Sequence, residues 1–117
     1  MSMIKGQNPN AYLIGNAQNG TVTLDIRNGT YQRCSLNGDT TFAMAGYGID
    51  GQTIALVIDY SGGNNITIDS SIHATDGLLD LLPMLLQAWK RYKIDFEFTG
   101  GMWQLTAISA PGQEWLD

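Results

Sequence analysis

Residues 92–109 read YKIDFEFTGGMWQLTAIS and indicate the class of fold most clearly. From Tyr92 to Phe98, apolar residues alternate with polar ones, which is the pattern of a strand with one buried face. The Gly100-Gly101 pair follows, and glycine adopts the positive φ angles of a tight hairpin turn without steric cost. The alternation then resumes from Trp103 to Ala107. This stretch therefore predicts a β-hairpin whose aromatic residues face a core.

The chain before this hairpin consists of short apolar segments separated by turn dipeptides. Asn-Gly occurs at 19–20, 28–29 and 37–38, and Gly-Gly occurs at 62–63. Strands are expected at 12–14, 21–26, 30–36, 39–45, 52–60 and from 66 toward 72. Short strands with closely spaced turn signals are typical of a sandwich or barrel. The sequence predicts an all-β fold, namely an antiparallel, jelly-roll-like β-sandwich joined by Asn-Gly and Gly-Gly turns.

The same alternation defines the expected core and the domain limits. Residues 1–10 show no periodicity and are expected to form an extended arm, while 110–117 form a tail after the last strand. A single β-sandwich domain is expected at 11–109. The core is predicted from the apolar positions of the strands, which are Leu24, Ile26, Leu56, Ile58, Ile94, Phe96, Phe98, Trp103 and Leu105.

Residues 75–91, TDGLLDLLPMLLQAWKR, do not fit the strand pattern. Leucines at helical spacing allow one short helix near 78–90, whereas Pro83 would interrupt such a helix and favours an extended apolar strip. In either structure the leucines need to be covered by the core or by another subunit. Candidate subunit or lattice contacts in this segment and near the two ends are Ile4, Tyr12, Leu82, Leu85, Leu86, Trp89 and Trp115.

Composition excludes several classes of partner. Charged residues make up 15% of the chain, and the net charge is −5 with 6 Lys and Arg. A chain with this charge lacks the basic surface that binds the phosphates of a nucleic-acid backbone, so nucleic acid is not an expected partner. The single cysteine, Cys34, excludes an internal disulfide and a paired-cysteine metal site. No apolar run reaches the length of a membrane span or a signal peptide, so no membrane partner and synthesis in the cytoplasm are expected.

Residues that could support catalysis are few. His73 lies near Asp69, Ser70 and Ser71, but neighbours along one strand end do not produce the geometry of a hydrolytic triad. Two further carboxylates, Asp95 and Glu97, share one strand face, as in any half-exposed strand. The carboxylates at 59, 69, 76 and 80 lack the spacing of a calcium loop. We expect no catalytic residues, no cofactor and no metal.

Three stretches carry a resemblance to a known family. In order along the chain they are TVTLDIRNGTYQRCSLNGDTTF at 21–42, GQTIALVIDYSGGNNITID at 51–69 and KIDFEFTGGMWQL at 93–105. They resemble the strand and turn pattern of a β-rich module in tailed-bacteriophage virion proteins, found in tail fibres, head fibres and other surface components. The resemblance covers roughly residues 21–109. It departs between 72 and 92, where the module has a short proline-containing loop and this chain has many more leucines.

The resemblance implies a structural role, often in trimers, without common catalytic residues. The expectation is a structural virion protein of a tailed phage, either a capsid decoration (cement) protein or a head-fibre protein. It would assemble in the host cytoplasm as a homotrimer and attach to capsid or tail subunits. The alternative is a receptor- or glycan-binding tail-fibre module, in which exposed aromatics among Tyr47, Tyr60 and Trp115 stack on sugars of the host surface.

Overall fold

A computed structural model describes residues 11–17, 20–60, 62–74 and 90–109. These ranges form nine strands and one short 3-10 helix. In chain order the elements are β1 (Tyr12–Ala17), β2 (Gly20–Leu24), η1 (Ile26–Asn28), β3 (Tyr31–Leu36), β4 (Thr40–Met44), β5 (Thr53–Tyr60), β6 (Ile66–Ile68), β7 (Ile72–Ala74), β8 (Lys90–Thr99) and β9 (Met102–Ser109). The predicted arm at 1–10, the tail at 110–117 and the choice between helix and strip at 75–89 lie outside the described residues.

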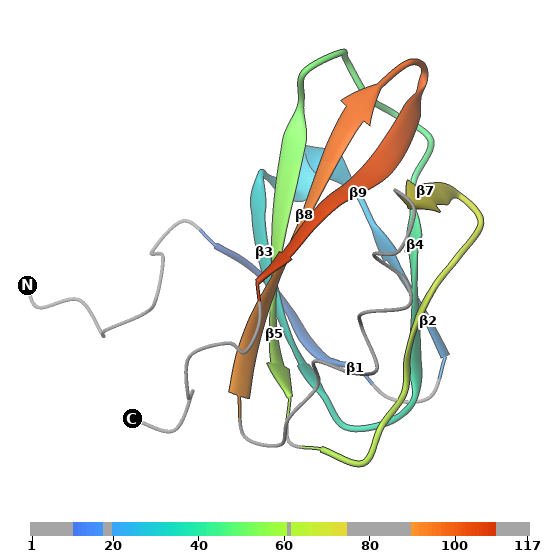
Figure 1. Ribbon diagram of the computed structural model, residues 1–117. Helices are drawn as coiled ribbons and strands as arrows, with labels where there is room; N and C mark the ends of the chain where they lie inside the picture. The colour runs from blue at the N-terminus through green and yellow to red at the C-terminus, as the bar shows by residue number, and fades with distance from the viewer. Residues whose placement is uncertain (1–10, 18–19, 61, 75–89, 110–117) are drawn as a thin grey trace, which may run out of the picture.

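The strands form two sheets, so the predicted all-β fold is confirmed. One sheet has six strands in the order β1-β3-β5-β8-β9-β7, and the other has three in the order β2-β4-β6 (Figure 1). Buried residues of both sheets form one hydrophobic cluster, which includes Leu24 and Phe42 from the small sheet and Leu56 and Phe96 from the large one. The core therefore lies between the two sheets.

The predicted antiparallel, jelly-roll-like arrangement is wrong for most strand pairs. The first six strands alternate between the two sheets, so each strand pairs with the next but one and runs parallel to it. The β7–β9 pair is also parallel, whereas β5–β8 and β8–β9 are antiparallel. The turn dipeptides at 28–29, 37–38 and 62–63 carry the chain from one sheet to the other instead of folding it back as a hairpin. The sandwich is therefore mixed.

The predicted hairpin at 92–109 is confirmed. Strands β8 and β9 pair antiparallel, and a register irregularity occurs between Asp95 and Phe96. The turn between them contains Gly100 at φ 65° and Gly101 at φ 81°. Residues other than glycine rarely adopt positive φ angles, which explains why two glycines occupy this turn.

Most of the residues that alternation assigned to the core are buried. Seven of them have relative exposures of 2% or less: Leu24, Leu56, Ile58, Ile94, Phe96, Trp103 and Leu105. Ile26 and Phe98 are only partly buried. Ile26 differs because the chain leaves β2 after Leu24 and turns into η1, whose first residue is Ile26. The strand expected at 21–26 is therefore shorter than the alternation suggested.

Cys34 is buried in β3, with 2% of its surface exposed. Burial, with a smaller effect from the charge of Asp59, raises the pKa of its thiol from 9.0 to about 12. We expect the folded protein to resist thiol-reactive reagents that modify the unfolded chain. Between about pH 9 and about 12 only the unfolded thiol ionises, so the free energy of unfolding should fall as pH rises through this window. The slope should be smaller in Cys34→Ala, and equal slopes would contradict the assignment.

Candidate functional site

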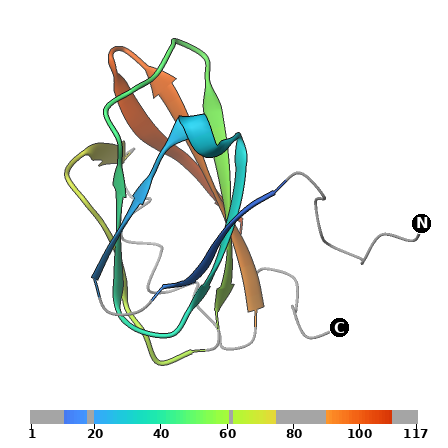
Figure 2. The same cartoon turned by 180° about the vertical axis from the view of Figure 1, so that it is seen from behind.

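One end of the sandwich gathers three segments that are far apart in sequence. They are η1, the β4–β5 loop at 45–52 and the β8–β9 turn, which lie at the same end in both views (Figures 1 and 2). Backbone hydrogen bonds join two of them: the Gly51 N–H donates to the Phe98 carbonyl at 2.9 Å, and the Phe98 N–H donates to the Gln52 carbonyl at 2.9 Å. The β4–β5 loop is therefore fixed against β8. We call this region the loop end.

An ion pair in η1 forms one side of the loop end. Asp25 caps η1 and accepts a hydrogen bond from the backbone N–H of Arg27 at 2.9 Å. The guanidinium of Arg27 also donates to both carboxylate oxygens, through Nε at 3.1 Å to each and through Nη2 at 2.7 Å to Oδ2. These side-chain hydrogen bonds lower the pKa of Asp25 and raise the pKa of Arg27. The pair is thus locally neutral, and its geometry is fixed.

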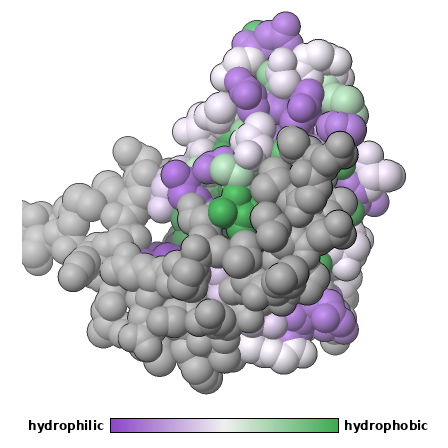
Figure 3. Space-filling view, in the orientation of Figure 1, coloured by the Kyte–Doolittle hydropathy of each residue, from purple (hydrophilic) through white to green (hydrophobic). Residues whose placement is uncertain are grey.

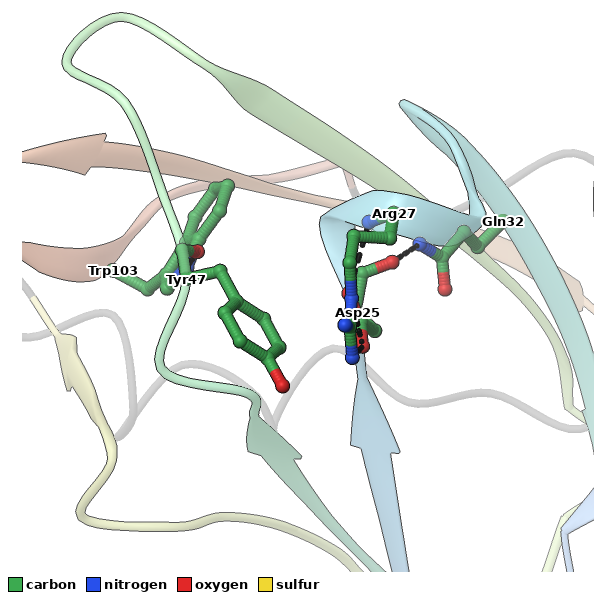
Figure 4. Close-up of polar contacts among 5 residues, drawn as sticks. All are labelled: Asp25, Arg27, Gln32, Tyr47 and Trp103. Carbon is green, nitrogen blue, oxygen red and sulfur yellow. Dashed lines mark hydrogen bonds and ion pairs between the residues drawn. The ribbon is translucent and has the colours of Figure 1, made fainter.

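Tyr47 from the β4–β5 loop meets this ion pair. The Cζ atom of Arg27 lies 3.9 Å from the centroid of the Tyr47 ring, a cation–π contact (Figure 4). Although Arg27 covers one side of the ring, Tyr47 remains 48% exposed. We call the cluster of Asp25, Arg27 and Tyr47 the platform.

Trp103 holds the platform from the side of β9. Its Nε1 donates to the Tyr47 carbonyl at 2.8 Å, and its ring makes an edge-on contact with Phe98 at a centroid distance of 5.4 Å. Trp103 itself is 2% exposed. A buried indole thus satisfies its only polar atom on the loop that carries Tyr47, and this bond fixes the position of the loop.

Gln32 holds the platform from the side of β3. This side chain is completely buried, and its Nε2 donates to the Asp25 carbonyl at 2.9 Å and to the Gly29 carbonyl at 3.0 Å (Figure 4). Within the ranges that the structure describes, its Oε1 has no hydrogen-bond partner. A buried amide oxygen without a partner is costly, and the two bonds made by Nε2 offset part of that cost. Gln32 and Trp103 together make the platform a preorganised surface.

Gly48 allows the loop to approach the hairpin closely. A Cβ at this position would lie 2.3 Å from Cδ1 of Phe98, whereas a Cβ at Gly46 would meet nothing within 4 Å. We expect Gly48→Ala to lower the free energy of unfolding by about 1–3 kcal/mol, because the Phe98 ring has to move. Chemical denaturation should detect this loss, and the matched Gly46→Ala variant should show much less. Equal effects in the two variants would contradict the close packing at Gly48.

A second polar cluster lies on the strands of the large sheet, away from the loop end. Arg33 of β3 donates to Oδ2 of Asp59 through Nε at 3.0 Å and Nη2 at 2.8 Å. Arg91 of β8 donates through Nε to Oδ1 of the same carboxylate at 2.8 Å. Asp59 is 4% exposed, so this cluster ties three neighbouring strands together in a poorly hydrated place. Its arrangement is structural.

The residue types of a hydrolytic triad are present, but they form a turn. Asp69 accepts from the Ser71 N–H at 2.9 Å, and this bond, followed by one from the Ser71 hydroxyl, lowers the pKa of Asp69. Ser71 Oγ accepts from the Met44 N–H at 3.0 Å. Among the described residues no hydrogen bond joins His73 to Asp69 or to either serine. The carboxylate and Ser71 therefore fix the β6–β7 turn against β4.

The other candidates from the sequence are distributed as follows. Asp95 and Glu97 both lie on β8, and Asp95 is 3.7 Å from the ammonium of Lys93. The part of the chain that the structure describes contains no group of three or more His, Cys, Asp or Glu side chains suited to a metal ion. No helix among the described ranges has the length and apolar character needed to span a membrane.

Of the predicted contact residues, Tyr12 is described and is 42% exposed. The other predicted contacts lie outside the described residues: Ile4, Leu82, Leu85, Leu86, Trp89 and Trp115. The prediction that Tyr60 is an exposed aromatic for sugar stacking is wrong. Its side chain is 6% exposed, and its hydroxyl donates to the Asn64 carbonyl at 2.7 Å. Tyr47 remains exposed, and Trp115 lies outside the described residues.

Sequence reasoning did not find the contact between Arg27 and Tyr47 or the roles of Gln32 and Trp103 in holding it. One signal was present: Arg27 follows Asp25 by two residues just before the Asn28-Gly29 turn, a spacing that suits an N-cap and its ion pair. Nothing in the sequence pointed to Tyr47 as the partner of Arg27. That contact depends on how the two sheets are joined.

Comparisons of the chain with protein-family models, curated proteins and solved structures gave no match.

Proposed function

We propose that this chain is a structural virion protein of a tailed bacteriophage, either a capsid decoration protein or a head-fibre protein. The observation that carries the proposal is the ordered set of three resembling stretches. The first covers most of β2, all of β3 and the first part of β4, the second covers β5 and β6, and the third covers most of β8 and the first half of β9. The resemblance thus follows the strands of both sheets instead of one isolated turn.

The polar clusters are consistent with a structural role. Asp59 and its two arginines join strands, while Asp69 and Ser71 fix a turn. The loop end presents a rigid platform that could contact another protein. Repeated attachment sites on a particle multiply weak contacts into firm binding, so a small domain is sufficient for this role.

The proposal includes self-association, with a homotrimer as the expected state, and attachment to capsid or tail subunits. Assembly takes place in the host cytoplasm. Light scattering on the purified chain tests the first part and should give a mass of several chains. A mass of one chain at high protein concentration would contradict the oligomer.

The functional test uses phage particles from a host that carries the gene for this chain. Particles are purified by density banding, and their proteins are identified by mass spectrometry. The chain should be found in the band of intact particles, in a fixed ratio to the major capsid protein. If the chain is abundant in the lysate but absent from the particle band, the virion role is wrong.

A receptor- or glycan-binding tail-fibre module remains the second candidate, and the exposure of Tyr47 favours it. Aromatic rings with one open side can stack on sugars, and the neighbouring ion pair offers hydrogen-bonding groups. A glycan array tests this function directly. Binding of the natural chain that is lost in Tyr47→Ala would support it, and an array without hits would reject it.

A further inference from the structure

The Asn-Gly turns of this chain contain a reactive dipeptide. Asparagine is among the thermolabile residues of proteins, and a following glycine has no side chain to shield its backbone nitrogen from the asparagine amide. Three such pairs occur in the chain, and for two of them, Asn28-Gly29 and Asn37-Gly38, both residues are described. Asn28 and Asn37 are both exposed. The two pairs therefore differ mainly in how the glycine is held.

The first pair, Asn28-Gly29, is held on both sides. The Asn28 N–H donates to the Asp25 carbonyl at 3.0 Å. The Gly29 N–H donates to the Ile26 carbonyl at 2.9 Å, and the Gly29 carbonyl accepts from Nε2 of the buried Gln32 at 3.0 Å. The Gly29 nitrogen is thus engaged as a donor at the end of η1. It can attack the asparagine side chain only after this hydrogen bond has opened.

The second pair, Asn37-Gly38, lies in the connection from β3 to β4, at the end of the sandwich opposite the loop end (Figures 1 and 2). The Gly38 carbonyl accepts from the Thr40 hydroxyl at 2.9 Å, but within the described ranges the Gly38 N–H donates no hydrogen bond. Although Gly38 is buried, Asn37 is exposed, and the described surface at this end is mainly hydrophilic or of intermediate hydropathy (Figure 3). Water therefore has access to the Asn37 side chain.

We propose that Asn37-Gly38 is a site of spontaneous covalent modification in the folded chain, and that the reaction passes through a succinimide. The Gly38 nitrogen loses its proton to solvent and attacks Cγ of Asn37. The new N–Cγ bond closes the ring, the bond from Cγ to Nδ2 breaks, and Nδ2 leaves as ammonia with a proton from solvent. Water then opens the ring at either carbonyl, which gives aspartate or isoaspartate at position 37. The reaction consumes water, releases ammonia and involves no oxidation or reduction.

The product affects the small sheet, because Asp39 links its strands close to the modified position. The Gly20 N–H donates to the Asp39 carbonyl at 3.1 Å, and the Asn65 N–H donates to Oδ1 of Asp39 at 2.8 Å. The Thr40 N–H in turn donates to the Asn65 carbonyl at 2.9 Å. Isoaspartate leads the main chain through its side chain and so adds a methylene carbon to the turn. The longer turn displaces Asp39 from these partners and should lower the thermal midpoint. This modification is independent of the proposed virion role.

The experiment incubates the purified full chain at mildly alkaline pH, both folded and in concentrated urea. Peptide mass spectrometry measures conversion at Asn28 and at Asn37 separately, with fragmentation that separates isoaspartate from aspartate. In the folded chain Asn37 should convert about 2–10-fold faster than Asn28, the factor that corresponds to the net contribution of one hydrogen bond. In urea the two rates should become similar, because the dipeptides are the same. Asn37 should also react faster in urea than in the folded chain, where Gly38 is buried.

Two variants at the same exposed position serve as controls. Asn37→Gln should keep the fold and lose the conversion at this position, because glutamine closes its larger ring far more slowly. Asn37→Asp adds the charge of the product without the additional carbon. Ion exchange separates the isoaspartate form of the natural chain, which should melt at a lower temperature than both Asn37→Asp and the unmodified chain.

Several results would overturn the inference. In the folded chain, they are conversion of Asn28 at least as fast as that of Asn37, or conversion at Asn37 that occurs only in urea. An aspartate product without isoaspartate would exclude the succinimide. An isoaspartate form that melts together with Asn37→Asp would show that the longer turn does not disturb the bonds of Asp39.

Discussion

Replacing Trp103 by alanine is expected to lower the free energy of unfolding by about 3–5 kcal/mol. Trp103 is 2% exposed and belongs to the core cluster between the sheets. Its removal leaves a large cavity, because the ring packs edge-on against Phe98 at 5.4 Å. It also removes the donor that holds the Tyr47 carbonyl. Chemical denaturation followed by circular dichroism measures the loss without depending on tryptophan fluorescence.

The variant Trp103→Phe separates packing from hydrogen bonding. Phenylalanine keeps much of the apolar bulk but cannot donate to Tyr47, and a net hydrogen bond contributes about 0.5–1.5 kcal/mol. We expect a smaller loss than in the alanine variant. An unchanged midpoint in Trp103→Ala would show that the hairpin is not part of the core.

Replacing Asp59 by alanine is expected to cost about 3–5 kcal/mol, because it removes the shared partner of two poorly exposed arginines. The side chains of Arg33 and Arg91 are 15% and 11% exposed, so water replaces the lost carboxylate only in part. The change also removes a link between β3, β5 and β8. Denaturant unfolding of the variant and the natural chain gives the difference.

The matched control for Asp59 is Asp95→Ala on β8. Asp95 pairs with Lys93 at 3.7 Å, and these side chains are 34% and 48% exposed. Exposed pairs contribute about 0.2–1 kcal/mol, so the control should be close to neutral. If both variants lose the same stability, burial does not determine the contribution of the Asp59 cluster.

The strands could be predicted because period-2 alternation marks one buried face. Ile94 and Phe96 are buried as the alternation from Tyr92 to Phe98 implied, and Gly100-Gly101 forms the turn that its backbone freedom suggested. The direction of pairing could not be predicted. Alternation is the same in parallel and antiparallel strands. Asn-Gly pairs favour hairpins, but in this chain those at 28–29 and 37–38 connect one sheet to the other.

The candidate site was less predictable than the fold. Arg27 and Tyr47 lie on different strand connections, and their contact follows from the passage of the chain between the sheets. Gln32 occupies an inward position of β3, on the same face as the buried Cys34 and opposite Leu56 of β5, where alternation alone would place a hydrophobic residue. The role of its side chain depends on two carbonyls in the β2–β3 connection. Such contacts depend on tertiary structure, which local sequence patterns do not encode.

Under the proposed function, this chain is a structural component on the head of a tailed-phage particle. Electron microscopy of purified particles, labelled with a gold-conjugated antibody against the purified chain, tests it most directly. Label is expected at regular positions over the capsid. Label confined to the tail would contradict the position on the head and favour the tail-fibre module, and particles without label beside a positive control against the capsid protein would contradict the virion role.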